Sequence, residues 1–355
     1  MMTDSNSIAQ APRHRDIALD ILRVIATVAV VMLHVANQHY RESFPGTQWA
    51  IRMSYDAIVR WGVPVFLMIS GALFLNPVRE VSLRHLYGKN LLRIVVAFFV
   101  WSYIYSFNRI NAGPWDKSLS LLLAGPSHLW YLKMLVGIYI AVPLLRAITA
   151  NRSTARYFVV VAAIATFVVP FVLALCKQHC NTMAVSAVKR FYDALYINVT
   201  AGYSGYFVLG HYLYTYRPSL RGRRIIYALG IVALLVIVTA TPLYSHRTGK
   251  SVNWFVNYLT PTVMALSAAV FVWATARPRN LGDRFNRWIV QASRLSFGIY
   301  LVHVLLLRTA LQHHIDSSSL NPLYFIPLYT LLTFVVAYVI SFVLNKIPYL
   351  NRYIV

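Results

Sequence analysis

The segment Ala18–Tyr40, ALDILRVIATVAVVMLHVANQHY, combines a long apolar stretch with charged and titratable side chains. About 20 apolar residues suffice to cross the roughly 30 Å hydrocarbon core of a membrane. Asp20, Arg23 and His34 nevertheless lie inside the stretch, and a charged side chain near the centre of a membrane helix costs roughly 2.5–3.5 kcal/mol on insertion scales. The segment therefore predicts a membrane-spanning helix whose polar residues have partners or a function inside the protein.

The composition of the whole chain agrees with a membrane protein. Of its 355 residues, 58% are hydrophobic and 12% are charged, and the mean hydropathy is +0.57. A soluble protein with this composition would have too little polar surface to cover its core. The net charge of +23 would suit nucleic-acid binding, but the basic residues lie in short clusters between apolar blocks, as membrane topology requires. We expect the lipid bilayer as a partner, and no nucleic acid.

The apolar blocks predict an all-α, polytopic helical bundle of about ten transmembrane helices. Their expected ranges are 17–38, 61–76, 88–107, 128–148, 156–175, 201–216, 224–241, 256–275, 294–312 and 323–345. An even number of spans puts both termini on one side of the membrane. The loops and termini of that side carry 20 of the 33 Lys and Arg residues, those of the other side carry 11, and Arg23 and Lys133 lie within spans. The positive-inside rule therefore places both termini in the cytoplasm.

This topology divides the chain into a cytoplasmic N-terminal tail at 1–16, one transmembrane domain at 17–345 and a cytoplasmic C-terminal tail at 346–355. Positions 1–16 are polar, and the apolar run that follows is too long for the hydrophobic region of a signal peptide. We therefore expect no cleavable signal peptide and a multi-pass location in the cytoplasmic (inner) membrane.

The polar residues of the first span form one stripe. Asp16, Asp20, Arg23, Thr27 and His34 follow at spacings of four, three, four and seven, which places them on one helix face. Asp20 and Arg23 are expected to pair, while Arg23 and His34 lie about 16 Å apart along the axis. Lipid would not tolerate this face, so it is expected to face the bundle interior or a wet cavity. The alternative is a pair that only locks helix packing.

A second polar stripe lies in the ninth span, in SRLSFGIYLVHVLLL. Ser296, Tyr300 and His303 stand at positions i, i+4 and i+7 and share a face. A second histidine at membrane depth favours a polar chamber that both stripes line.

The residues available to this chamber limit its chemistry. Asp16 and Asp20 are the only carboxylates within or beside the predicted spans, so a mechanism with paired carboxylates is not expected. His34 is the natural general base because imidazole titrates near neutral pH. Arg23 suits a phosphate or a developing negative charge. No metal site is expected.

Four motifs together indicate a family. They are LDILRVIATVAVVMLH (19–34), WGVPVFLMISGALFL (61–75), HLWYL (128–132) and SFGIYLVH (296–303). In this order, over about residues 17–345, the chain resembles the membrane-bound acyltransferase 3 family. Within that family it is similar to surface-polysaccharide O-acetyltransferases, such as those acting on enterobacterial common antigen.

The resemblance implies that acetyl is taken from cytoplasmic acetyl-CoA and passed to a hydroxyl of a cell-surface polysaccharide or its lipid-linked precursor. It places the family's essential Arg and His on Arg23 and His34, and it places Tyr300 and His303 near the same cavity, which they would line or where they would relay a proton. Asp20 would orient Arg23, which would hold the donor or stabilise the oxyanion. His34 would deprotonate the acceptor hydroxyl or receive the acetyl group itself.

The donor site is expected at a basic rim where the third span begins. Arg84, Lys89 and Arg93 form this rim, whose alternative explanation is positive-inside topology alone. The family often has an Arg-x2-Arg element here, but this chain has KNLLR, with Asn90 in place of the first Arg. Lys89 would then supply that charge for the phosphates of CoA.

Five further residues lie outside the two stripes. Lys133 is expected to extend to the membrane interface, and His128 at the same outer mouth either packs or helps to bind the acceptor. His211 follows a small-residue helix face and is expected to be a packed polar residue. Cys176 and Cys180 could form a disulfide in an oxidising compartment.

Other functions remain open from the sequence. Transfer of another acyl group, such as succinyl, or N-acetylation of a glycan would use the same residues. A transporter or exporter of a lipid-linked glycan could use the stripes as a proton relay, although the chain shows no internal repeat of the kind typical of secondary transporters.

Overall fold

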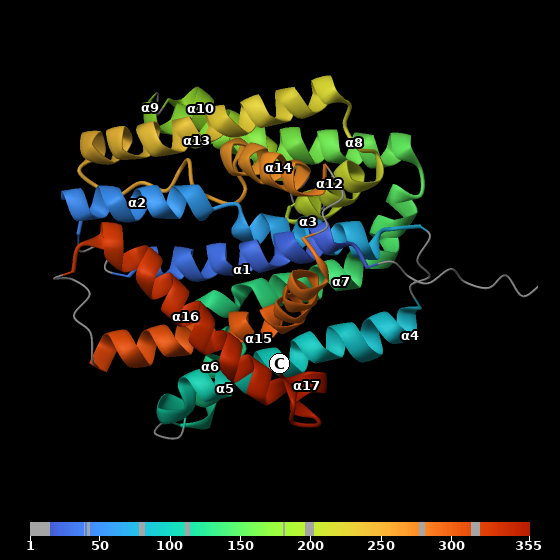
Figure 1. Ribbon diagram of the computed structural model, residues 1–355. Coiled ribbons are helices and arrows are strands. Elements are labelled where there is room, and N and C mark those ends of the chain that lie inside the picture. Colours follow the sequence, from blue (N-terminus) through green and yellow to red (C-terminus); the bar gives the residue numbers. More distant parts are fainter. Residues whose placement is uncertain are drawn as a thin grey trace, which may run out of the picture.

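The computed structural model describes residues 15–38, 40, 43–77, 82–110, 114–179, 182–195, 202–276, 281–313 and 320–355. Over these residues the regular structure is helical, with no strand, so the predicted all-α bundle is confirmed. Figure 1 shows helix α1 (Ile17–Ala36) in the middle of the bundle, with helices on both sides of it.

Helix α1 is enclosed by protein along most of its length. It begins after Asp16, whose Oδ1 accepts a hydrogen bond from the backbone N–H of Ala18 at 2.8 Å and so caps the helix. Around it pack α2 (Thr47–Val59), α3 (Gly62–Phe74), α14 (Pro261–Thr275), α15 (Asp283–His313) and α16 (Pro322–Asn345). The polar stripe therefore faces the interior rather than lipid.

The second predicted span is longer than expected. Helices α2 and α3 follow one another closely, and Thr47–Phe74 is long and apolar enough to cross a membrane. The extension brings Asp56 into the span, 3% exposed, where its Oδ1 accepts from Arg60 at 3.1 Å and from Asn37 at 2.9 Å. The expectation that Asp16 and Asp20 are the only carboxylates near the spans was therefore wrong. The polar residues of α2 lowered its apparent hydrophobicity.

Helices α3 and α12 (Ser204–Thr215) cross with their backbones in contact. A Cβ atom on Gly71 would lie 1.8 Å from the backbone oxygen of Phe207, and one on Gly210 would lie 2.2 Å from that of Met68. Only glycine fits at both positions, which explains the glycine in each apolar sequence. His211, next to Gly210, is fully buried, as expected for a packed residue.

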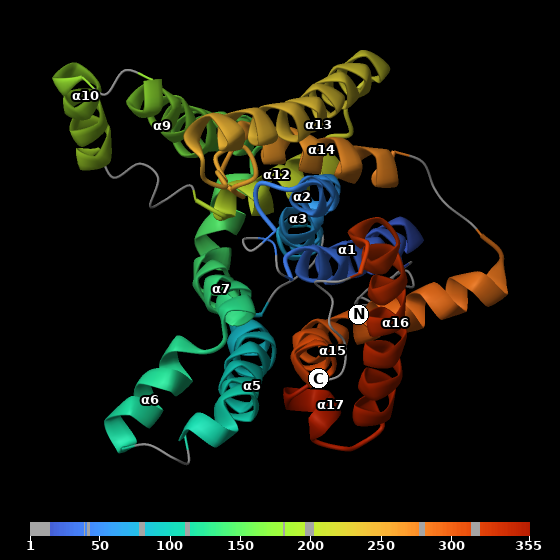
Figure 2. The ribbon, with the colours of Figure 1, turned by 90° about the vertical axis from the view of Figure 1, so that its left-hand side faces the viewer.

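The remaining helices surround this centre. On one side lie α4 (Leu83–His85), the π-helical turn Leu86–Leu91, α5 (Leu92–Ile110) and α7 (Trp130–Thr149). A short 3-10 turn, Ser127–Leu129, leads into α7. On the other lie α8 (Arg152–Ala162), α9 (Val169–His179) and α13 (Leu220–Thr248). Figure 2 shows α6 (Trp115–Ala124) and α10 (Met183–Ala194) projecting away from the bundle.

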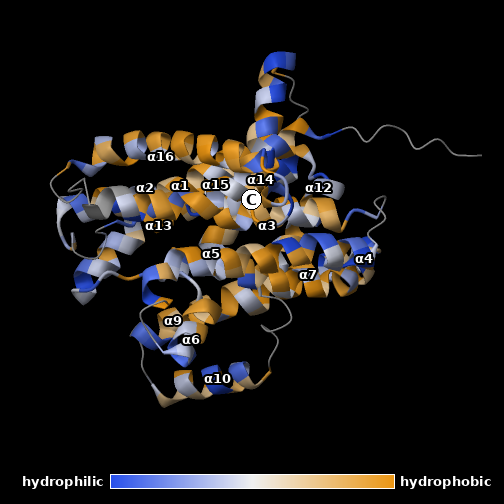
Figure 3. Ribbon diagram, turned by 90° about the horizontal axis from the view of Figure 1, so that it is seen from below, coloured by the Kyte–Doolittle hydropathy of each residue, from blue (hydrophilic) through white to orange (hydrophobic). Residues whose placement is uncertain are grey.

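Eight described segments are long and apolar enough to span a membrane: Ile17–Ala36, Thr47–Phe74, Leu83–Ile110, Ser127–Thr149, Arg152–Gln178, Leu220–Thr248, Asp283–Thr309 and Pro322–Asn345. Figure 3 shows the hydrophobic colouring of several of these helices. The chain is therefore a multi-pass membrane protein. The sixth and eighth predicted spans coincide with α12 and α14, of 12 and 15 residues, which cover only about 18 and 22 Å. Ten crossings and cytoplasmic termini stay predictions.

The segment after α16 is not an extended tail. After the short helix α17 (Leu350–Tyr353), the chain returns to α5, where Trp101 donates to the backbone oxygen of Ile354 at 3.0 Å. Val355 is 2% exposed and lies against Gly298 of α15. Cys180, the candidate disulfide partner of Cys176, lies outside the described residues, and Cys176 is exposed.

Candidate active site

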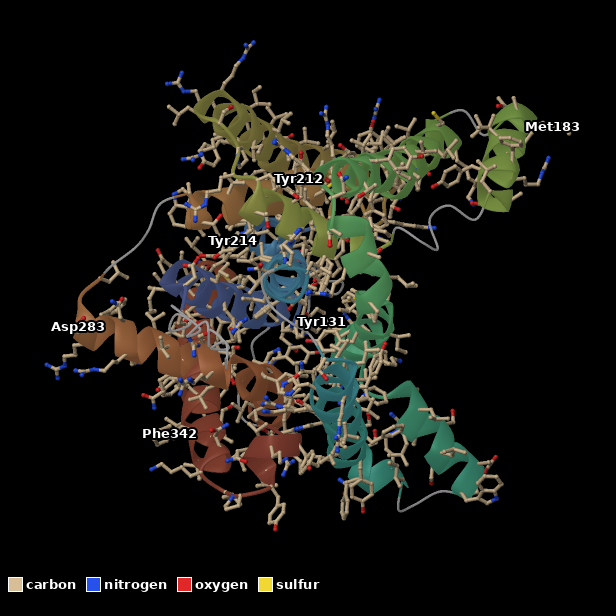
Figure 4. All side chains as sticks on the ribbon, turned by 90° about the vertical axis from the view of Figure 1, so that its right-hand side faces the viewer. Tyr131, Met183, Tyr212, Tyr214, Asp283 and Phe342 are labelled. Carbon is tan, nitrogen blue, oxygen red and sulfur yellow. The ribbon has the colours of Figure 1, made fainter. Side chains whose placement is uncertain are left out.

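A cavity of about 710 Å³ lies beside α1 and joins the two polar stripes. One end, which we call the arginine end, is lined by Arg15, Arg93 and Arg294. The other, the histidine end, is lined by His34, His128 and Trp130. Arg23 lines the cavity between them, and Figure 4 shows Tyr131, another lining residue, near the centre of the molecule.

Asp20 pairs with Arg15 and not directly with Arg23. Its two carboxylate oxygens accept from Nε and Nη2 of Arg15 at 2.5 and 2.7 Å. The hydroxyl of Ser293 donates to Oδ1 of Asp20 at 2.5 Å and accepts from Arg23 at 3.4 Å. The expected Asp20–Arg23 pair is thus replaced by a contact through Ser293, because Arg15, just before α1, reaches the carboxylate in bidentate geometry. The hydrogen bond to Asp20 also raises the pKa of Arg15.

Two members of the stripe serve the helix itself. Besides capping α1, Asp16 accepts a hydrogen bond from the hydroxyl of Tyr214 at 2.5 Å. Thr27 is buried and donates to the backbone oxygen of Arg23 at 2.8 Å, a bond within the same helix. Arg23 and His34 are therefore the stripe residues that remain available to act on a substrate.

Three histidine rings meet at the histidine end. The ring centroid of His34 lies 4.9 Å from that of His303 and 6.3 Å from that of His128, and the His128 and His303 centroids are 6.0 Å apart. These residues come from α1, α15 and the turn before α7, so the fold brings together positions far apart in sequence. The expected shared chamber of the two stripes is therefore present, and His128 joins it.

Hydrogen bonds set the tautomers of two of these histidines. The carbonyl of Val30 can only accept, so Nδ1 of His34 carries the hydrogen and donates to it at 3.1 Å. In the same way Nδ1 of His303 donates to the carbonyl of Tyr300 at 2.6 Å. The Nε2 atom of each ring then carries the lone pair. His34 lines the cavity, so its Nε2 is the nitrogen available to take a proton from a bound substrate.

His128 is buried without hydrogen-bond partners. It is 5% exposed, and neither ring nitrogen bonds to any residue that the structure describes. The ring of Tyr105 packs 4.7 Å from it, while the hydroxyl of Tyr300 donates to its backbone oxygen at 2.6 Å. Buried polar atoms normally have partners, so this ring is a candidate for contact with a substrate.

The second stripe contains one residue more than expected. Ser296 is buried and donates to the backbone oxygen of Ser293 at 2.8 Å, which leaves Tyr300 and His303 closest to the histidine end. Ser293 precedes Ser296 by three residues and so shares its helix face. Its spacing could have identified it from the sequence.

The predicted basic rim enters the site only in part. Arg93 and Asn90 line the arginine end, whereas Arg84 and Lys89 are exposed and do not. Arg93 donates to the backbone oxygen of Val355 and lies over the ring of Phe297 at 4.9 Å. Lys89 therefore does not take the place of the missing arginine in this cavity.

Aromatic rings cluster at the histidine end. Trp130 stacks on Tyr258 with centroids 5.6 Å apart, and it packs against Tyr203 at 5.4 Å. Arg60 lies over the Tyr258 ring at 4.8 Å. Lys133 points elsewhere and donates to the backbone oxygen of Ala124. The sequence alone could not have identified Tyr258, because it stands in a loop with no recognisable pattern.

Comparison with known proteins gives one positive result. A family model described as an acyltransferase domain, that of the acyltransferase 3 family, matches residues 16–342. No curated protein and no solved structure matches the chain.

Proposed function

The chain belongs to the acyltransferase 3 family, and we propose that it transfers an acetyl group from acetyl-CoA to a hydroxyl of a cell-surface polysaccharide or of its lipid-linked precursor. The donor would bind at the arginine end, on the cytoplasmic side of the inner membrane, and the glycan at the histidine end. The excess of Lys and Arg in the loops and termini on the arginine-end side supports this orientation.

The observation that carries the proposal is a single cavity lined by both Arg23 and His34. A reaction that joins a donor from one side of a membrane to an acceptor on the other needs such a continuous polar space. The positive charge at one end attracts an anionic donor such as acyl-CoA, whereas the stacked rings at the other end suit the apolar faces of a sugar.

The spacing along α1 indicates different roles for Arg23 and His34. Arg23 and His34 are eleven residues apart, or about 16 Å along the axis, so one reacting carbonyl cannot contact both. Helical side chains also incline toward the N-terminus, which directs Arg23 to the arginine end. Of the two roles expected for Arg23, holding the donor is therefore favoured over stabilising the oxyanion.

His34 acts as the general base in the proposed reaction. The acceptor oxygen attacks the thioester carbon while Nε2 of His34 takes the hydroxyl proton. The carbon–sulfur bond then breaks, and the departing thiolate recovers the proton from His34 to leave as CoA. His303 packs against the His34 ring and so positions the base, while Tyr300 holds the backbone at His128. The alternative route, in which His34 itself carries the acetyl group, uses the same lone pair.

Transfer of labelled acetyl from acetyl-CoA tests the proposal. Membranes containing the protein are given acetyl-CoA labelled on its acetyl group and a lipid-linked glycan extract, and alkali-labile label in the glycan is measured. We compare the natural protein with His34→Gln and, as a matched control, with His85→Gln, since His85 is exposed on α4 away from the cavity.

Label that enters the glycan and depends on His34 but not on His85 supports O-acetyl transfer. If label enters the glycan with all three proteins, His34 is not required for the transfer. Label that enters only from succinyl-CoA, or that resists alkali, identifies the other acyl transfers. If a lipid-linked glycan crossed the membrane of proteoliposomes in the absence of CoA, the result would favour the transporter function.

A further inference from the structure

A second hollow of about 750 Å³ opens between α15 and α16, next to the arginine end. It shares Arg294 and Asn345 with the active-site cavity, so the two spaces adjoin. Figure 4 shows Asp283 at the start of α15 and Phe342 on α16, two residues that line this hollow. We call it the α15–α16 groove.

The groove carries a net positive charge, because its lining holds three cations and one carboxylate. Arg287, Arg294 and Lys346 line it together with a single carboxylate, that of Asp283. Neither arginine forms an ion pair or hydrogen bond within the described part of the chain, and the Lys346 amine contacts only the Phe342 ring, at 4.5 Å. This arrangement of unpaired cations fits a polyanionic ligand.

In contrast, two cations of the active-site cavity already have partners within the protein. Arg15 holds Asp20 in a bidentate pair, and Arg93 is bonded to Val355 and stacked on Phe297. Arg23 lines the cavity as a single cation, with only a long contact to Ser293 at 3.4 Å. A ligand with several phosphates would therefore find most of its free cations in the groove.

The groove also offers contacts for a nucleobase. The amides of Gln291 and Asn345 can hydrogen-bond to a base edge, and the half-buried ring of Phe342 provides a stacking surface. Phosphate-binding cations, amides and an aromatic ring together match a nucleotide better than a simple anion.

We propose that the α15–α16 groove binds the nucleotide end of CoA, with its 3′-phosphate and diphosphate held by Arg287, Arg294 and Lys346. The pantetheine arm then passes Arg294 into the cavity and carries the acyl group toward His34. This proposal rests on acyl-CoA being the donor. It also accounts for Asn90, because the cations missing from the start of α5 are supplied by α15 and α16.

Equilibrium binding of CoA to the full chain in lipid nanodiscs tests the proposal. The groove variant is Arg287→Ala with Lys346→Ala. The control is Arg221→Ala with Arg284→Ala, which removes the same charge from exposed positions outside the groove lining. We expect the groove variant to raise the Kd for CoA about tenfold, equivalent to about 1.4 kcal/mol, and the control to leave it unchanged. The same measurement with dephospho-CoA, which lacks the 3′-phosphate, shows whether that phosphate is the group that these cations bind.

A second measurement does not depend on the affinity of a double variant. Arg287→Cys and Arg284→Cys are each introduced into protein with Cys176→Ser and Cys180→Ser, and labelled with a maleimide. Adenosine 3′,5′-bisphosphate is expected to slow labelling at position 287 but not at position 284. The probe lacks the arm, so protection reports the nucleotide site alone.

The outcomes separate the two proposals. If the natural protein binds CoA, while the groove variant binds it equally well and position 287 is not protected, the groove assignment is wrong and the acyl-CoA donor stands. If the natural protein binds no CoA or acyl-CoA, the proposed donor is wrong and the groove assignment fails with it.

Discussion

Substitution of Arg23 and of His34 is expected to change different kinetic constants. The two residues share one face of α1 but lie eleven positions apart, which corresponds to about 16 Å along the axis. If Arg23 holds the donor and His34 takes the proton, Arg23→Gln affects the binding of acetyl-CoA. His34→Gln affects the chemical step. Glutamine preserves polarity at both positions but carries neither a charge nor a basic ring nitrogen.

The magnitudes follow from the contacts that each residue can make. A hydrogen bond from a charged group is worth about 1.5–3 kcal/mol, so Arg23→Gln is expected to raise the KM for acetyl-CoA by roughly 10- to 150-fold with little change in kcat. The long 3.4 Å contact of Arg23 with Ser293 adds little to the cost. Loss of a general base lowers rates by about 10²- to 10⁴-fold, so His34→Gln is expected to lower kcat at nearly constant KM.

The assay measures initial rates of acetyl transfer in nanodiscs at saturating glycan, with acetyl-CoA varied. Arg156→Gln, an exposed cation on α8, is the matched control and should behave as the natural protein. The reasoning is refuted if Arg23→Gln lowers kcat a hundredfold and leaves the KM for acetyl-CoA unchanged. Such a result would place Arg23 at the reacting carbonyl despite the spacing.

Three further substitutions test the packing and the histidine end. Gly71→Ala should destabilise the protein by about 3 kcal/mol, the upper end of the usual cost of overpacking, measured as a drop in Tm. Gly137→Ala, where a Cβ meets nothing, should not lower the Tm. Asp20→Asn should cost about 2 kcal/mol, because the charge of Arg15 loses its buried partner, and an unchanged Tm would contradict the pairing. His128→Phe should keep or raise the Tm, since two buried unpartnered nitrogens disappear, yet lower kcat/KM for the glycan at least about tenfold. Full activity would exclude a substrate contact.

Helical periodicity was sufficient to predict which residues of the candidate site share a helix face. The spacing of Arg23 and His34 placed them on one face, and the same rule placed Tyr300 and His303 together on α15. Such patterns hold because residues on one helix face keep their neighbours whatever the rest of the fold does. The structure adds that the two faces meet, which no local pattern could establish.

Contacts between elements were not predictable in this way. Asp20 was assigned to Arg23 by its i, i+3 spacing, but Arg15 lies outside the helix, and nothing in the spacing revealed that it reaches Asp20. Asp56 was placed outside the membrane because polar residues in α2 masked a helix whose charges are paired. In each case the folded protein supplies a partner for a buried charge. That partner offsets the desolvation cost that makes a buried charge unexpected from the sequence alone.

The glycine crossing of α3 and α12 has a consequence for how the protein moves. With no side chain between the two backbones, neither helix can slide or rotate without atomic overlap. Because α3 forms part of the cavity wall, that wall is a rigid support, and amide hydrogens near Met68 and Phe207 should exchange among the slowest in the molecule. Movement that admits a substrate is therefore expected at the other walls of the cavity, which α5, α7 and α15 form.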